Sequence, residues 1–261
     1  MNQTKSKLIG LLWIACAFLL TAAFVLGLPF FAKAIPWSYE KKLANFVGEL
    51  PQLEVCKNTV GKAEFQKLIS RIYPVLEADT QVPITIQVVQ GEEINAFASL
   101  GAKIYVYEGL IKQAQSAEEL AGVLAHEIEH VRLRHIIQGV LVRVLTLEAI
   151  DLAMGNTGSV DPKLLNMILN MRFSREQESE ADLQGLRRLQ QAKIDVAGFR
   201  RFFEREENQS TIPAILSDHP SPQNRAELTQ QYAGSPIVPI LEPGEWRAIK
   251  SLCHRPPTKI R

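Results

Sequence analysis

The stretch "ELAGVLAHEIEHVRLRH", residues 119–135, constrains this chain more than any other part of its sequence. Apolar side chains recur along it at helical spacing, which predicts a buried helix. Three polar side chains, His126, Glu127 and His130, stand among these apolar residues. Since burying such groups without partners is costly, we infer that they bind a metal cation.

The spacing of the two histidines favours zinc. Residues four apart lie on one face of a helix, so His126 and His130 present two imidazoles to the same point. Glu127 follows His126 and is rotated from it by about 100 degrees, so its carboxylate can reach a water molecule without becoming a ligand. A metal at such a site lowers the pKa of water toward neutrality, and the carboxylate acts as general base.

A catalytic zinc needs a third protein ligand and an open fourth position. His135 does not fit the pattern that places a third histidine ten residues after the first, because Ile136 occupies that place. We therefore expect His135 to be a helix-end residue or a group behind the ligands.

The third ligand is expected in "FSREQESEADLQG", residues 173–185. Glu178 and Asp182 are four apart and share a helix face, which suggests Glu178 as ligand and Asp182 as the acceptor that orients an imidazole. Glu176 and Glu180 define a different face, which we expect to be solvated.

The remaining pattern predicts an α+β domain, in which a small sheet accompanies a helical majority. The segments "ITIQVVQ" and "KIYVYEGLI" are typical of strands, and the glycine-bounded "GEEINAFASLGA" is expected to connect them. Ser116 and Glu119 predict the start of the metal-binding helix. Other helices are expected at residues 59–73, 139–152, 161–191 with a possible break, 195–207 and 222–232.

An uncharged segment near the N-terminus, residues 8–32, is about long enough to cross a bilayer as one helix. It predicts a transmembrane anchor. The small-x-small pattern Ala32-Lys33-Ala34 after Pro29 also allows a cleaved signal peptide, while Trp13 disfavours a lipid anchor on Cys16.

Composition limits the choice of partners. The formal net charge is only +1, and no polybasic run or interleaving of basic and aromatic residues occurs, which excludes a nucleic-acid-binding role. Cys56 and Cys253 flank the expected domain. They could form a disulfide in an oxidising compartment or remain two partly buried thiols.

At this point the sequence resembles the zinc metalloendopeptidases that include HtpX and the CAAX prenyl endopeptidases. The likeness rests on "INAFA", "GAKIYVYEGLI", "ELAGVLAHEIEHV", "SREQESEAD" and "HPSPQNR", in that order. It implies a gluzincin fold with one zinc ion per chain. The ligands would be His126, His130 and Glu178, with Glu127 as catalytic base and Asp182 as helper carboxylate.

The resemblance also implies a substrate site. An edge strand near residues 102–108, with Ala102, Ile104 and Val106, would receive an extended substrate by strand addition. Asn95 would help to hold the substrate backbone there.

The segment "LSDHPSPQNR" is open to two interpretations. By its local pattern His219 is a turn residue, whereas the resemblance suggests that it can reach the zinc. Arg225 is a candidate for anchoring this loop or for holding a transition-state oxygen.

A single anchor ahead of the domain resembles the periplasmic or organelle-facing quality-control branch of the family. We therefore expect a single-pass membrane protein whose catalytic domain is non-cytosolic, or a secreted periplasmic form. Its substrates would be unfolded or misassembled envelope proteins.

One alternative function is that of a chaperone-like assembly factor with little proteolytic turnover, and another is that of a zinc-stabilised scaffold with four closed ligands. The expected organisation is an anchor (1–34), a linker (35–58), a zinc metallopeptidase domain (59–233) and a C-terminal tail (234–261).

Overall fold

The computed structural model describes residues 30–48, 53–74, 82–153, 171–208, 213–219, 225–232 and 237–253, together with the isolated positions 13, 15, 16, 19, 27 and 234.

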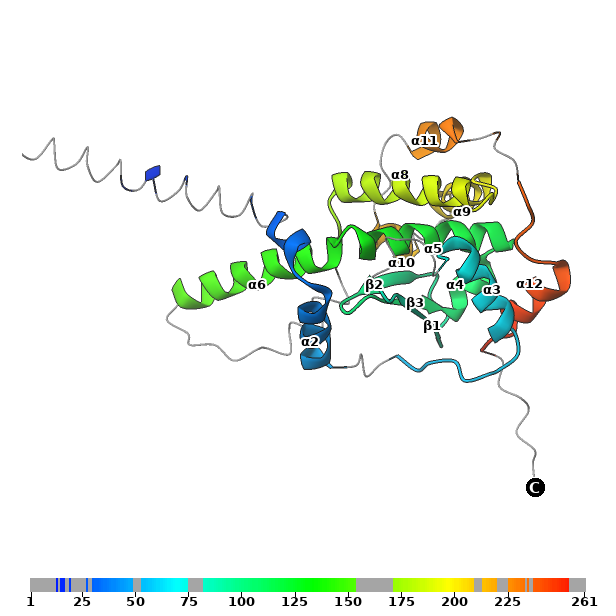
Figure 1. Cartoon of the computed structure of the whole chain (residues 1–261), viewed down its shortest axis with the longest axis horizontal. Coiled ribbons are helices and arrows are strands. Elements are labelled where there is room, and N and C mark those ends of the chain that lie inside the picture. Colours follow the sequence, from blue (N-terminus) through cyan, green and yellow to red (C-terminus); the bar gives the residue numbers. More distant parts are fainter. Residues whose placement is uncertain are drawn as a thin grey trace, which may run out of the picture.

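Helices predominate and the sheet is small, as the sequence predicts (Figure 1). The elements are α2 (Trp37–Val47), α3 (Lys62–Ile72), β1 (Thr85–Val89), β2 (Ala96–Ser99), β3 (Lys103–Tyr107), α4 (Glu108–Gln113), α5 (Ala117–Arg132), α6 (His135–Ala153), α8 (Arg175–Gln191), α9 (Ala197–Glu207), α10 (Ala214–Asp218), α11 (Arg225–Gln231) and α12 (Pro243–Lys250).

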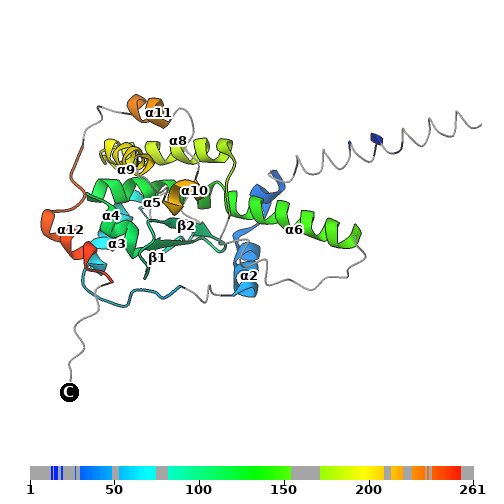
Figure 2. The same cartoon turned by 180° about the vertical axis from the view of Figure 1, so that it is seen from behind.

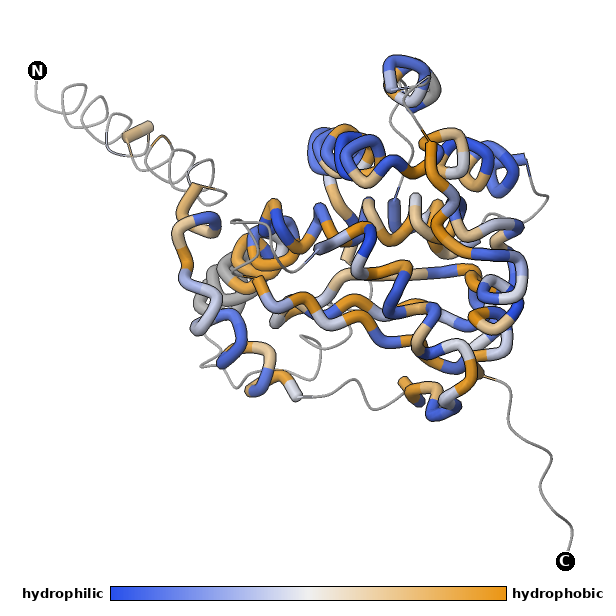
Figure 3. Tube along the Cα trace, turned by 45° about the vertical axis from the view of Figure 1, so that its right-hand side comes forward, coloured by the Kyte–Doolittle hydropathy of each residue, from blue (hydrophilic) through white to orange (hydrophobic). Residues whose placement is uncertain are grey.

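Helix α5 is the centre of the domain. The sheet lies on one side of it and helices α8 and α9 lie on the other (Figures 1 and 2). Hydrophobic residues follow the strands and the inner helix, whereas α8 and α9 carry many hydrophilic residues (Figure 3). Because it is covered on both sides, α5 buries nearly all of its side chains.

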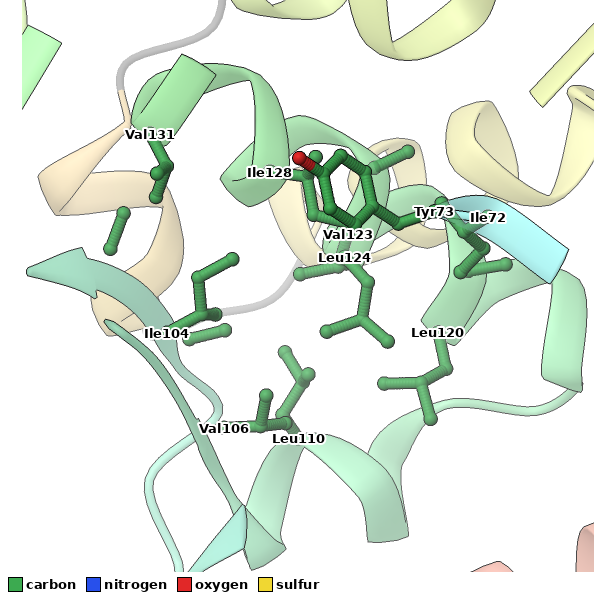
Figure 4. Close-up of a cluster of buried hydrophobic side chains, with 14 of the residues drawn as sticks. Ile72, Tyr73, Ile104, Val106, Leu110, Leu120, Val123, Leu124, Ile128 and Val131 are labelled. Carbon is green, nitrogen blue, oxygen red and sulfur yellow. The ribbon is translucent and has the colours of Figure 1, made fainter. Parts of the chain in front are cut away.

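Local sequence explains how α5 begins and what it packs against. The side chain of Ser116 accepts a hydrogen bond from the backbone N–H of Glu119 at 3.3 Å, so the helix begins where predicted. The Glu119 carboxylate accepts from the backbone N–H of Gln115 at 2.9 Å instead of closing a capping box on Ser116. The apolar side chains of α5 face those of the sheet and of α3 and α4 in one core (Figure 4). Each fully buried side chain of this size stabilises the fold by about 1.5–3 kcal/mol.

Helices α5 and α9 approach closely because each contributes a glycine. A Cβ on Gly122 would lie 2.8 Å from Cα of Phe199, and one on Gly198 would lie 2.7 Å from the carbonyl carbon of Glu118. Neither distance is possible for a larger residue without separating the helices. These glycines bring α9 onto the N-terminal half of α5.

The sheet has the order β1-β3-β2, with β1 parallel and β2 antiparallel to β3. The sequence analysis missed β2, which lies inside the expected connection. All four of its residues are buried, so it lacks the alternation of polar and apolar residues that identifies a half-buried strand. The expected second strand was also too long, since its last residues form α4.

The topology corrects the predicted substrate strand. β3 is the central strand and pairs on both sides, so the prediction that residues 102–108 form an edge was wrong. Ala102, Ile104 and Val106 are all 0% exposed. Ile104 and Val106 point into the space between the sheet and α5, where they belong to the hydrophobic core (Figure 4). Within the described residues, β1 and β2 are the two edge strands, and residues 54–56 pair with the outer side of β1, whereas no strand pairs with that of β2.

Several helix bounds differ from those expected. α6 starts at His135 rather than at residue 139, and α8 starts at Arg175 after the capping residue Ser174. Residues 161–170 and 222–224 of the expected helices lie outside the described residues. Helices α2 and α12 occur in the segments expected to be linker and tail, where the sequence analysis assigned no element.

The predicted membrane segment lies almost wholly outside the described residues. Among those that are described, no helix combines the length and the apolar character needed to span a membrane.

A disulfide joins the two ends of the domain. Cys56 and Cys253 are bonded, with 5.0 Å between their Cα atoms, so the structure shows the paired alternative. The backbone N–H of Cys56 donates to the carbonyl of Val88, at 2.9 Å, and the side-chain amide of Asn58 donates to the carbonyl of Ser251, at 3.1 Å. The disulfide therefore holds the segment after α2 and the end of α12 against the same side of the domain.

Replacing both cysteines by serine, Cys56→Ser with Cys253→Ser, should lower the free energy of unfolding by about 2–4 kcal/mol, because the bond closes a long loop in the unfolded chain. Urea denaturation of the double variant and the wild type under non-reducing conditions would measure the difference. Cys16→Ser is the control, since Cys16 is exposed and unpaired in the described structure. Equal stability of the double variant and the wild type would contradict the role of the bond.

Candidate metal centre

Four side chains from three helices converge in the domain. His126 and His130 extend from α5, Glu178 from α8, and His219 caps the C-terminal end of α10. One ligand atom from each residue lies within 4.8 Å of all the others. The structure thus brings together the histidine pair and the carboxylate selected from the sequence, and it places His219 beside them, as the family resemblance suggested.

The contacts identify which atoms face the centre of this cluster. Nε2 of His126 lies 3.0 Å from Nε2 of His130 and 3.2 Å from Nδ1 of His219. Nδ1 of His219 lies 3.1 Å from Oε1 of Glu178. Three imidazole nitrogens and one carboxylate oxygen form a donor set typical of zinc.

Unpartnered atoms support a cation at this position. Among the described residues, neither oxygen of Glu127 has a hydrogen-bond partner, and Oε2 of Glu178 has none. Both side chains are 0% exposed. Buried carboxylate oxygens that accept no hydrogen bond are costly, so the residues fit a metal ion and a water molecule beside it.

The electrostatics of the cluster also favour added positive charge. Burial raises the pKa of Glu178, but the neighbouring His219, His126 and His130 outweigh burial and hold this pKa well below its usual value. Burial lowers the pKa of His126, but the hydrogen bond to Asp182 and the nearby carboxylates of Glu178 and Asp182 outweigh burial and raise this pKa to about 10. The carboxylates therefore stabilise a cation between the helices.

Glu127 differs from the ligand candidates in its environment. Burial raises its pKa above the usual value, although the charges of His219 and His126 partly oppose this shift. Its Oε1 lies 3.4 Å from Nε2 of His219. A buried carboxylate with a raised pKa is suited to accept a proton near neutral pH.

Asp182 and Arg225 support His126 from behind. Nδ1 of His126 lies 2.8 Å from Oδ1 of Asp182, so Asp182 occupies the place expected of an orienting carboxylate. Arg225 donates from Nε to Oδ2 of Asp182 at 2.7 Å, and its guanidinium lies 4.1 Å from the ring centroid of Phe203. Arg225 thus orients the carboxylate of Asp182, which in turn orients the imidazole of His126.

Asn95 lies at the edge of the site but faces α10. Its side-chain amide donates to Oδ2 of Asp218 at 3.1 Å, one residue before His219. Its contact with substrate stays a prediction. The predicted substrate residues Ala102, Ile104 and Val106 lie in the core instead.

Two further side chains adjoin the centre. The ring of Phe173 packs on that of His130, with 3.9 Å between ring centroids. This contact was not predicted, and its only signal in the sequence is an aromatic residue next to the helix cap Ser174.

His135 lies behind His130, and burial lowers the pKa of His135 to about 4, so its imidazole is neutral at pH 7. Glu176 is exposed and Glu180 partly exposed, in line with the solvated face expected of them.

Comparison with known proteins agrees with this geometry. A family model described as Peptidase family M48 matches residues 61–232. The chain is 30% identical over 162 residues to the beta-barrel assembly-enhancing protease of Escherichia coli K12, covering 56% of this chain and 33% of that protein. It is 31% identical over 157 residues to the metalloprotease LoiP of the same organism, covering 56% of this chain and 61% of LoiP.

A mitochondrial relative is similar to the same extent. The chain is 30% identical over 158 residues to the mitochondrial metalloendopeptidase OMA1 of Schizosaccharomyces pombe, covering 56% of this chain and 46% of that protein. It thus spans between a third and three fifths of the length of these relatives.

The expected metalloendopeptidase family is confirmed in its broad form, while the particular likeness to HtpX and the CAAX prenyl endopeptidases stays a prediction. The family model covers the metal-binding helix, the acidic helix and the segment with His219. The chain belongs to peptidase family M48.

Proposed function

We propose that this protein is a zinc-dependent endopeptidase that hydrolyses unfolded or misassembled membrane or envelope proteins. The observation that carries the proposal is the buried carboxylate of Glu127, which has no hydrogen-bond partner among the described residues and lies beside the converged ligand atoms. A purely structural zinc site needs no such group.

The residues divide the chemistry among them. His126, His130 and Glu178 would hold the zinc, which when bound supplies a Lewis acid that polarises the peptide carbonyl and makes water more acidic. Glu127 removes a proton from the attacking water and then delivers it to the leaving amine nitrogen. Asp182, itself held by Arg225, keeps Nδ1 of His126 protonated and its Nε2 directed at the centre.

Strand β2 is the best candidate for binding substrate. It pairs with β3 on one side, and within the described structure no strand pairs with its other side. An extended peptide could add to that edge through backbone hydrogen bonds. The helix α5, which carries Glu127, packs against β2, so a peptide bound there would lie beside the catalytic residues.

The relatives support a role at membranes. The name of one relative refers to β-barrel assembly and that of another to the mitochondrion. The disulfide between Cys56 and Cys253 is typical of an oxidising compartment, and residues 8–32 predict an anchor. Together these features favour a membrane-attached enzyme whose catalytic domain is on the non-cytosolic side.

We propose further that the enzyme is latent in this arrangement. His219 fills the fourth position of the cluster, and all four ligand candidates are at most 1% exposed. Helix α10 is fastened beside β2, since the N–H of Ile215 donates to the carbonyl of Ile94 at 3.3 Å and Asn95 bonds to Asp218. Moving α10 would open both the metal centre and the edge of β2.

A second candidate function follows from the same cluster. Four buried protein ligands are the arrangement of a structural zinc site, so the protein could be a zinc-stabilised scaffold or a chaperone-like assembly factor. The two possibilities differ in what His219 does. A structural ligand is needed for the metal to stay bound, whereas a gating residue can be removed without losing it.

The purified full chain should bind about one zinc ion per chain, and His126→Ala, His130→Ala and Glu178→Ala should each reduce the bound zinc, because each removes a ligand. Metal analysis by atomic emission after dialysis would measure the zinc content. Glu176→Ala is the matched control, because Glu176 lies on the same helix but is exposed. Wild-type zinc content in Glu178→Ala would contradict the assignment and implicate Glu176 or Glu180.

Glu127→Gln should keep zinc and the fold but lower the cleavage of an unfolded protein such as casein by roughly 10²–10⁴-fold, because the amide has the shape of the acid but cannot take up the proton. Proteolysis by the variant at the wild-type rate would exclude this mechanism. In cells, the substrates should accumulate in this variant.

His219→Ala should raise basal proteolysis and self-cleavage while the other ligands retain zinc, since the change opens the fourth position. Self-cleavage of this variant is to be compared with the wild type and with the His219→Ala, Glu127→Gln double variant, which gives the background. Loss of zinc from His219→Ala would favour the structural site. Lower activity with zinc retained would instead make His219 a transition-state or substrate group.

A further inference from the structure

His135 lies directly behind one of the ligand candidates. It is 1% exposed at the start of α6, and its Nδ1 lies 3.1 Å from Nδ1 of His130. On its other side, Nε2 of His135 lies 3.4 Å from Oε2 of Glu180. His130 directs its own Nε2 at the metal centre, so Nδ1 is the ring atom through which the protein can hold this imidazole.

The positions of the protons follow from these contacts. An imidazole that binds a metal through Nε2 carries its proton on Nδ1. Two Nδ1 atoms can share a hydrogen bond only if one of them is protonated, so His130 donates and His135 accepts. The proton of a neutral His135 is then on Nε2, from which it is donated to the carboxylate of Glu180.

The turn between α5 and α6 explains why His135 reaches back to His130. Arg134, between them, has φ of 66°, a left-handed conformation that is unfavourable for a residue with a side chain. Its guanidinium is held by Oε2 of Glu40 at 2.7 Å, by the carbonyl of Ile35 at 2.6 Å and by the ring of Trp37 at 3.8 Å. The segment at the start of α2 therefore fixes the backbone that orients His135.

We propose that His135 is a positioning residue for the metal ligand His130, with Glu180 as the acceptor behind it. The hydrogen bond fixes the tautomer of His130 and the orientation of its ring, as Asp182 does for His126. This inference rests only on the metal-binding part of the proposed function. It is independent of whether the protein cleaves peptides.

The test is the zinc affinity of the metal-stripped full chain, measured by competition with a chromophoric chelator. His135→Leu replaces the imidazole by an apolar side chain of similar size that cannot accept a hydrogen bond, so affinity should fall by about 10–100-fold. His135→Asn places a side-chain oxygen where it can accept from His130 and should restore most of the affinity. If His135 served only to pack the core, His135→Leu should bind zinc more tightly than His135→Asn.

Two further variants complete the design. Gln138→Ala removes another buried polar side chain of α6, one that donates to the carbonyl of Leu133 at 2.9 Å, and should leave zinc affinity unchanged. Glu180→Ala removes a side chain that is 42% exposed, so the variant should fold and bind zinc several-fold more weakly. Circular dichroism of each metal-free variant checks the fold.

Wild-type zinc affinity in His135→Leu, or equal weakening in His135→Leu and His135→Asn, would overturn the proposal. If His135→Leu does not fold, Glu180→Ala decides the question, and unchanged affinity there is the negative result. The casein assay tests the proteolytic function separately. If that function is wrong, Glu127→Gln and the wild type will not differ in casein cleavage, while the effect of His135→Leu on zinc affinity will remain.

Discussion

The fold depends on carboxylates of α8 being buried against imidazoles of α5. Glu178 and Asp182 are both 0% exposed, and each contacts His126. Burial of ionised carboxylates is unfavourable unless cations or hydrogen-bond donors compensate for it. The histidines and Arg225 provide that compensation, and a bound metal ion would add to it. The candidate metal centre therefore also helps to join α5 and α8.

The pairs of side chains at the candidate metal centre could be predicted from the sequence because both members of each pair lie on one helix. Residues four apart in one helix share a face whatever the tertiary structure, so His126 with His130 and Glu178 with Asp182 were identifiable as pairs. The start of α5 was likewise determined by a local interaction, between Ser116 and the N–H of Glu119. Such features need no knowledge of how the helices pack.

Other features were beyond the sequence because they depend on long-range contacts. β2 is buried along its whole length and has no alternating pattern, and only the pairing with β3 identifies it as a strand at an edge of the sheet. α12 was missed because its eight residues hold only a short apolar pattern, and its packing on α3 is what orders it. The hydrogen bond between His135 and His130 likewise depends on a turn held by Glu40 and Trp37.

His219 contacts both the metal-ligand candidates and the candidate general base. Its Nδ1 faces Nε2 of His126 and its Nε2 lies 3.4 Å from Oε1 of Glu127, so a single ring fills the fourth place in the cluster and covers the carboxylate. His219 caps a helix of five residues, whereas the other three candidates extend from helices of 16 and 17 residues. Opening a five-residue helix breaks fewer helical hydrogen bonds than opening a long packed one, so it costs less free energy. If His219 gates the centre, as proposed above, it is the candidate whose displacement disturbs the fold least.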